Sequence, residues 1–66
     1  MKEKYSLVGV DGNAFVIMGY VRNAMKKCGF TEDQIKDYLK QATSSDYYNL
    51  IAVSQDIIEQ CNEREK

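Results

Sequence analysis

Apolar residues recur every three or four positions along most of the chain, which is the spacing of an amphipathic helix. Three such stretches predict helices over residues 12–28, 32–43 and 45–62. The apolar face of the first comprises Ala14, Ile17, Met18, Val21, Ala24 or Met25, and Cys28. That of the second comprises Ile35, Tyr38, Leu39 and Ala42. The inward face of the third comprises Tyr47, Leu50, Ile51, Ser54, Ile58 and Cys61.

Residues typical of helix starts precede each stretch. Asp11 or Asn13 can cap the first helix, because a short polar side chain accepts a hydrogen bond from an otherwise unpartnered backbone N–H. Thr31 and Gln34 form a capping box ahead of the second helix. The third helix follows Ser44-Ser45-Asp46, in which the acid favours the positive end of the helix dipole.

The helical period is absent before the first helix. β-Branched and aromatic residues there predict a strand over 4–10. An unpaired strand edge is a liability, and no second strand is evident, so we expect pairing with the same strand of a second copy. The alternative is an extended arm that lies on the helices. The predicted fold is therefore mainly α, a β-α-α-α three-helix bundle in one domain, with a frayed charged tail over 63–66.

The first helix carries more apolar surface than one core-facing stripe requires. Phe15, Val16, Gly19 and Tyr20 lie outside its stripe. A glycine inside a helix costs about 1 kcal/mol relative to alanine. Gly19 therefore indicates the close approach of either another helix or a ligand, and close helix packing is the favoured interpretation.

Length and composition favour a small cytoplasmic oligomer. A chain of 66 residues is near the size at which a single core is only marginally stable, so a partner copy is the expected source of further stability. The polar start Lys2-Glu3-Lys4 is not a signal segment, and no apolar run reaches the roughly 20 residues of a membrane span. In an up-down-up bundle Cys28 and Cys61 lie at one pole. A disulfide is possible there, and two reduced, buried thiols are favoured in a cytoplasm.

The usual catalytic and metal-binding residues are missing. The chain has no histidine, so it lacks the commonest general base, and its two cysteines are too few for a zinc site. The Gly9-x-x-Gly12 turn matches neither the dinucleotide fingerprint nor a phosphate loop. Asp11-x-Asn13 begins like a calcium loop but lacks the later ligands. We expect no metal, no cofactor and no enzymatic activity.

The charge distribution indicates a local anion site instead. Residues 1–28 carry five cations and two acids, whereas residues 29–66 carry four cations and eight acids. The basic part contains the start of the first helix, where backbone N–H groups can receive an anion. The predicted phosphate-binding set is Asp11, Gly12, Asn13, Arg22 and Lys26. A single basic helix in an acidic protein does not make a nucleic-acid track.

Aromatic side chains near this set can stack on a base or another ring. Phe15, Tyr20 and Tyr48 are the candidates. Aromatic residues at helical spacing more often belong to the core. Tyr48 is the best exposed candidate, because Tyr47 takes the inward position on the third helix.

Three motifs resemble those of a family of small proteins from bacteriophages, prophages and their bacterial hosts. They are Val10-Asp11-Gly12-Asn13-Ala14-Phe15, Met18-Gly19-Tyr20, and Ser44-Ser45-Asp46-Tyr47 with Leu50. Small phage proteins of this size include oligomeric sponges that sequester the cyclic nucleotide signals of bacterial immunity, as in CBASS and Thoeris. By analogy, the resemblance implies a phage-encoded, non-catalytic homo-oligomer, a dimer or higher, that binds a small anionic ligand in the host cytoplasm and serves immune evasion.

The alternative function is a protein-interaction module. Acids gather in the C-terminal half, and Val53 and Ile57 add a second apolar edge to the third helix. These features suit a phage-encoded inhibitor or adaptor that binds a host protein.

Overall fold

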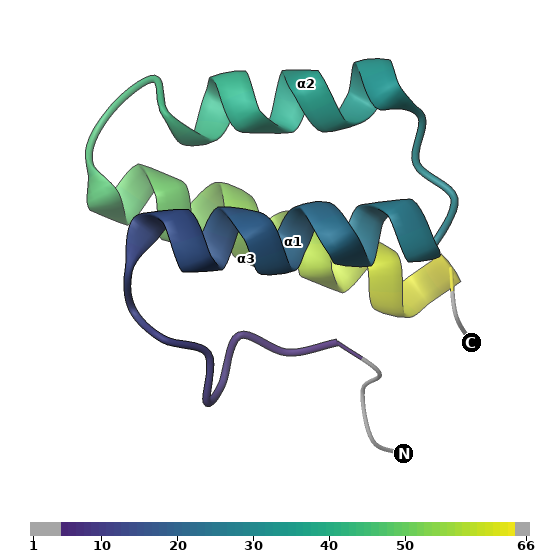
Figure 1. Cartoon of the computed structure of the whole chain (residues 1–66), viewed down its shortest axis with the longest axis horizontal. Coiled ribbons are helices and arrows are strands. Elements are labelled where there is room, and N and C mark those ends of the chain that lie inside the picture. Colours follow the sequence, from purple (N-terminus) through teal and green to yellow (C-terminus); the bar gives the residue numbers. More distant parts are fainter. Residues whose placement is uncertain (1–4, 65–66) are drawn as a thin grey trace.

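Three antiparallel helices form the fold. The computed structural model describes residues 5–64, with α1 at Ala14–Lys27, α2 at Glu32–Ala42 and α3 at Tyr47–Arg64. Each helix runs opposite to the one before it, and α1 lies in front of α3 with α2 along one side of the pair (Figure 1). The predicted mainly helical bundle is therefore observed.

The polar residues at the helix starts act as caps. The Asn13 side chain accepts a hydrogen bond from the Phe15 N–H at 2.9 Å, and Thr31 and Gln34 complete a capping box. The Asp46 carboxylate accepts from the Asn49 N–H at 3.0 Å. These bonds satisfy donors that a helix start leaves without partners, which explains why the three helices begin within two residues of their predicted starts.

The predicted strand is wrong for the residues that the structure describes. Residues 5–13 form no strand, and Lys4, the first residue of the predicted strand, lies outside the described range. Instead the chain turns between Leu7 and Val10, whose N–H donates to the Leu7 carbonyl at 3.1 Å, with Gly9 at a φ of 85°. The left-handed conformation at Gly9 is incompatible with a continuous strand.

Side chains take the place of a pairing strand. The Tyr5 N–H donates to Asn62 Oδ1 at 2.8 Å, and the Asn62 amide donates back to the Tyr5 carbonyl at 3.0 Å. The Ser6 N–H donates to the Tyr20 hydroxyl at 2.9 Å. The alternative to strand pairing, an arm that lies on the helices, is thus observed at Tyr5 and Ser6, but the turn between Leu7 and Val10 means that the arm is not extended throughout. Figure 1 shows this bend in the chain before α1.

The C-terminal end of α3 also differs from the prediction. The helix continues to Arg64, so Glu63 and Arg64 are helical where a frayed tail was predicted, and residues 65–66 lie outside the described range. The Asn62 contacts with the N-terminal arm and an Arg64 guanidinium stacked 3.9 Å from the Phe30 ring centroid hold this last turn.

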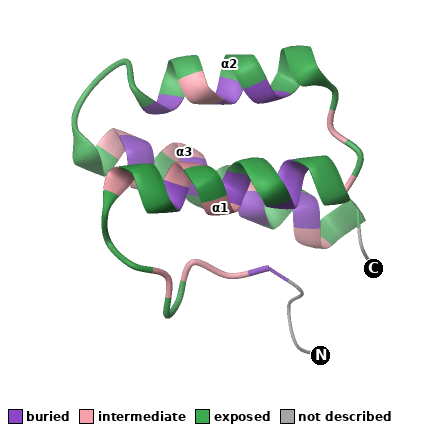
Figure 2. Ribbon diagram, in the orientation of Figure 1, coloured by how far each residue is buried: buried purple, intermediate pink, exposed green. Residues whose placement is uncertain are grey.

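Most residues of the predicted apolar faces point inward (Figure 2). Tyr47, which was predicted to face inward, is instead 46% exposed, and its hydroxyl reaches the Gly12 carbonyl before α1. α1 buries Ile17, Val21, Ala24 and Met25 against Ile35, Tyr38 and Ala42 of α2 and Leu50, Ile58 and Cys61 of α3. Ser54 is the one buried polar residue among those described, and its hydroxyl pairs with the Tyr38 hydroxyl at 2.6 Å. Burial raises the pKa of the Tyr38 hydroxyl, and the bond to Ser54 partly offsets the shift.

The two cysteines meet where α1 and α3 end, as the up-down-up arrangement predicts. Cys28 Sγ lies 2.7 Å from Cys61 Sγ, and both residues are thiols. Cys61 is fully buried and Cys28 is half-buried.

Candidate functional site: the outer face of α1

The turn that precedes α1 is held by its own side chains. Asp11 Oδ1 accepts from the Asn13 N–H at 2.9 Å, and Asn13 in turn caps the Phe15 N–H. The Tyr47 hydroxyl donates to the Gly12 carbonyl at 2.6 Å. The Asn13 N–H, one of the helix-start donors predicted for an anion, is therefore already used within the chain, and an incoming anion would lie next to the Asp11 carboxylate.

A larger exposed surface runs along α1 away from the bundle. We define the outer face of α1 as the exposed residues Phe15, Val16, Gly19, Arg22, Asn23 and Lys26. The Phe15 side chain is 80% exposed and that of Val16 is 45% exposed. Single exposed apolar side chains are common, but Phe15 and Val16 are adjacent, and a contiguous exposed apolar patch is a candidate contact surface for a ligand or a partner.

Gly19 lies in the middle of the outer face. A β-carbon built at Gly19 meets no atom of residues 5–64 within 4 Å, so no group in this part of the chain requires the glycine. Phe15 and Val16 lie one turn before it, and Arg22 and Asn23 lie one turn after it. Gly19 therefore leaves the helix backbone uncovered by a side chain between the turn that carries Phe15 and Val16 and the turn that carries Arg22.

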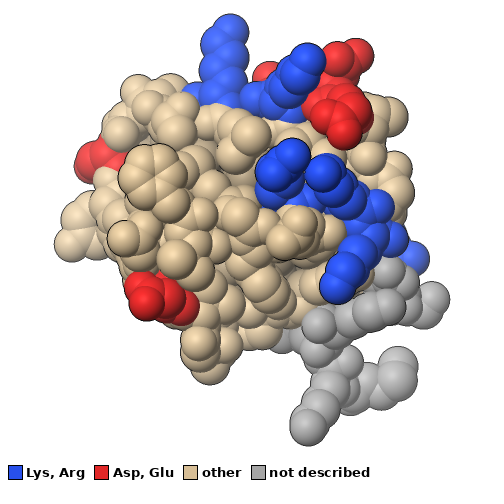
Figure 3. Space-filling view, in the orientation of Figure 1, with Lys and Arg blue, Asp and Glu red and all other residues tan. Residues whose placement is uncertain are grey.

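The cations of the outer face have no acidic partner among residues 5–64. Arg22 and Lys26 are four residues apart on one side of the helix, so their side chains are neighbours. Figure 3 shows Lys and Arg gathered toward the C-terminal end of α1 and along α2, while the centre of this face carries no charge. The field of the outer face is positive at one end and favours an anion there.

The structure does not bring all predicted site residues together. Arg22 and Lys26 lie about 14 and 20 Å along the helix from Asn13, at a rise of about 1.5 Å per residue. The Tyr20 hydroxyl binds the Ser6 N–H, so Tyr20 holds the N-terminal arm. Tyr48 is 82% exposed but belongs to α3. Within one chain, only Phe15, Arg22 and Lys26 share the outer face.

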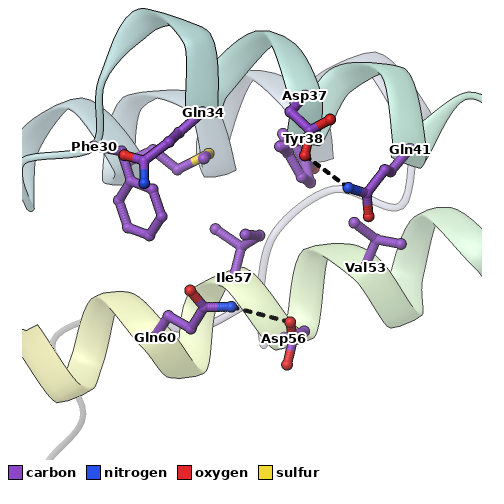
Figure 4. A pocket seen from close by; sticks show the side chains of 10 residues that line it. Phe30, Gln34, Asp37, Tyr38, Gln41, Val53, Asp56, Ile57 and Gln60 are labelled. Atoms are coloured by element: carbon purple, nitrogen blue, oxygen red, sulfur yellow. Dashed lines mark hydrogen bonds between the residues drawn. The ribbon is translucent and has the colours of Figure 1, made fainter.

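A groove between α2 and α3, of about 260 Å³, escaped the sequence analysis (Figure 4). Val53 and Ile57 lie on the α3 side, with Phe30 at one end. Asp37 accepts from the Gln41 side chain at 2.8 Å, and Asp56 accepts from the Gln60 side chain at 3.0 Å. The repeated Asp-x-x-x-Gln spacing is the sequence signal that could have indicated these polar rims.

The Asp37 and Asp56 carboxylates make no ion pair with any residue in 5–64. Each therefore presents an unneutralised negative charge beside the half-buried apolar side chains Val53 and Ile57. The groove is the acidic counterpart of the basic outer face of α1.

Within the same range of residues, no three His, Cys, Asp or Glu side chains are placed to hold a metal ion. No described helix is both long and apolar enough to cross a membrane. Comparison of the chain with protein-family models, with curated proteins and with solved structures finds no match. The function is therefore inferred from the arrangement of the residues alone.

Proposed function

We propose that this protein is a non-catalytic homo-oligomer that binds a small anionic ligand, with a cyclic nucleotide immune signal in a bacterial cytoplasm as the specific case. One observation carries the proposal. Phe15, Arg22 and Lys26 place on one side of α1 an exposed aromatic ring and two cations that have no acidic partner among residues 5–64.

The chemistry of these groups suits a nucleotide. A base stacks on the face of Phe15, because stacking on an aromatic side chain requires no particular hydrogen-bond pattern. The Arg22 guanidinium offers a planar pair of donors to phosphate oxygens, and Lys26 adds a point charge four residues away.

The proposal requires more than one subunit. Small-molecule sites are concave and bury most of the ligand, whereas the outer face of a single helix is convex. A second subunit over the same face would close the ligand in. Ligand binding at this face therefore depends on oligomer formation.

The direct test is native mass spectrometry of the purified protein with a panel of linear and cyclic nucleotides. A stoichiometric mass increment with one of them supports the proposal. Arg22→Glu should weaken binding at least about tenfold, since a charged hydrogen bond is lost and a repulsive charge is added.

Lys36→Glu is the matched control, because Lys36 is an exposed cation on α2 and not on the outer face of α1. Equal loss of binding in the two variants would indicate a general charge effect. Absence of any nucleotide increment on the wild-type protein would contradict the proposal.

The α2–α3 groove favours a second candidate, the protein-interaction module. Its apolar residues Val53 and Ile57 beside Asp37 and Asp56 suit an amphipathic helix that carries Lys or Arg beside its apolar stripe. The double variant Asp37→Asn/Asp56→Asn keeps an amide oxygen at each site. It should weaken binding of a basic Leu/Lys model peptide by about 2- to 30-fold in fluorescence anisotropy. An unchanged affinity would contradict this candidate.

A further inference from the structure

We propose that a second copy of the chain docks antiparallel on the outer face of α1, and that the two helices cross at Gly19. The inference deepens the proposed function by naming the surface that joins the subunits. It replaces strand pairing, because Asn62 and Tyr20 of the same chain bind the backbone of Tyr5 and Ser6, and the chain turns between Leu7 and Val10.

Gly19 marks the crossing point. Packed helices normally lie about 8–10 Å apart, at a distance set by the side chains at the contact, and a residue without a side chain permits the closest approach. The glycine costs the monomer helix stability, and nothing in its own chain occupies the space beside it. A second α1 that packs across Gly19 would use the space that the missing side chain leaves.

The antiparallel register pairs unlike groups. With the two Gly19 residues face to face, Phe15 lies opposite Asn23 of the second copy, and Val16 lies opposite Arg22 of the second copy. The Arg22 guanidinium is then within reach of the Phe15 ring across the interface. The same kind of stack exists within the chain, where Arg64 lies 3.9 Å from the Phe30 ring centroid.

Charge complementarity extends this pairing to the ends of the helix. Asp11, exposed before the start of α1, lies opposite Lys27 of the second copy, at the basic end of α1. Only Oδ1 of Asp11 accepts the Asn13 N–H, so the other oxygen remains available to the lysine. A parallel pair would instead place Arg22 on Arg22 and Lys26 on Lys26, and like charges in contact are repulsive.

The same arrangement completes the scattered anion site. Gly12, at the turn before one helix, comes opposite Lys26 of the second copy, so helix-start donors and a cation about 20 Å apart in one chain meet across the two-fold axis. Symmetry makes two equal sites. Gly12 and Lys26 of the predicted set, which a single chain separates, are thus brought together by two, whereas Arg22 lies opposite Val16.

The test is sedimentation equilibrium without ligand, where the 7.6 kDa chain should give a dimer of about twice that mass. Gly19→Leu should raise the dimer dissociation constant at least about tenfold while circular dichroism keeps its helical signal, because the new side chain meets nothing in its own chain. Ala52→Leu, at an exposed position of α3, is the matched control and should leave the constant unchanged.

Cysteine substitution tests the orientation. Oxidised Gly19→Cys protein should form a covalent dimer at the crossing point. Asn23→Cys should not, because an antiparallel pair separates the two copies of residue 23 by about 12 Å along the axis, beyond disulfide reach. A covalent dimer of Asn23→Cys would overturn the antiparallel register.

A wild-type protein that remains at 7.6 kDa up to about millimolar concentration would overturn the inference. So would a Gly19→Leu variant that dimerises like the wild type. These outcomes test the interface between the two copies and not the identity of the ligand. A dimer that loses affinity with Gly19→Leu yet binds no nucleotide supports the interface and contradicts the ligand. A monomer that binds nucleotide contradicts the interface and the requirement for a second subunit, but it supports the anionic ligand.

Discussion

The buried hydroxyl pair Tyr38–Ser54 gives the sharpest stability prediction. The two oxygens lie 2.6 Å apart, and the residues are 2% and 0% exposed. Ser54→Ala leaves the Tyr38 hydroxyl buried without its partner, which should cost about 1–3 kcal/mol of unfolding free energy. Tyr38→Phe should cost about 1 kcal/mol, since a serine in a helix can instead donate to the carbonyl four residues before it.

The double variant should be less destabilised than the sum of the two single variants. With both hydroxyls absent, no polar group is left buried, so a coupling energy of about 1–2 kcal/mol is expected. Each kcal/mol corresponds to a melting shift of about 4–8 °C in a domain of this size. Urea unfolding followed by circular dichroism measures all four proteins.

Strict additivity would refute the reasoning, because it would show that the two hydroxyls do not depend on each other. A Ser54→Ala variant as stable as the wild type would refute it more directly. That result would mean that the Tyr38 hydroxyl finds water in the native state.

The remaining predictions concern pH, oxidation and the N-terminal arm. Burial raises the folded pKa of Tyr38 above its ordinary value near 10. The protonated hydroxyl therefore contributes its full stabilisation below about pH 10, and this stabilisation is lost as the pH rises through the folded pKa. In urea titrations above pH 10, Tyr38→Phe should show a smaller fall in unfolding free energy than the wild type. Mild oxidation should form a disulfide between Cys28 and Cys61, whose sulfurs lie 2.7 Å apart. The intact mass should fall by two hydrogens, and the unfolding free energy should rise by about 3–4 kcal/mol. An unchanged intact mass would contradict this. Asn62→Ala should release the Tyr5 backbone and speed amide exchange in residues 5–13 while the helix amides keep their protection, and uniform acceleration would argue against a separate arm.

The anion site and the α1 interface use the same residues, and this sharing has a consequence for ligand binding. If the ligand lies between two outer faces, its binding free energy adds to the dimer, and the dimer dissociation constant falls as ligand is added. A ligand that binds elsewhere would leave that constant unchanged. Sedimentation with and without nucleotide therefore reports the location of the ligand as well as its affinity.

The sequence alone determined the helices, because their signals are local. The apolar residues recur at helical spacing, and the caps at Asn13, Thr31 and Asp46 lie directly before the helices. Each of these signals involves only residues that are close together in the sequence. The inward faces followed for the same reason, apart from Tyr47, which is exposed. The meeting of Cys28 with Cys61 also followed, because it needs only the helix order.

The tertiary structure decided what these local signals leave open. Residues 5–10 have strand-like composition, yet Asn62 and Tyr20 bind the backbone of Tyr5 and Ser6, and the chain turns at Gly9. The contact of Tyr5 with Asn62 spans 57 positions. Which of the predicted site residues lie together, and which lie apart, was also decided by the fold. Spacing along α1 placed Phe15, Arg22 and Lys26 on one face, but only packing showed that Tyr20 is engaged by the arm and that nothing of the same chain covers Gly19. Burial is a property of the assembled bundle, and periodicity indicates a face without stating what covers it.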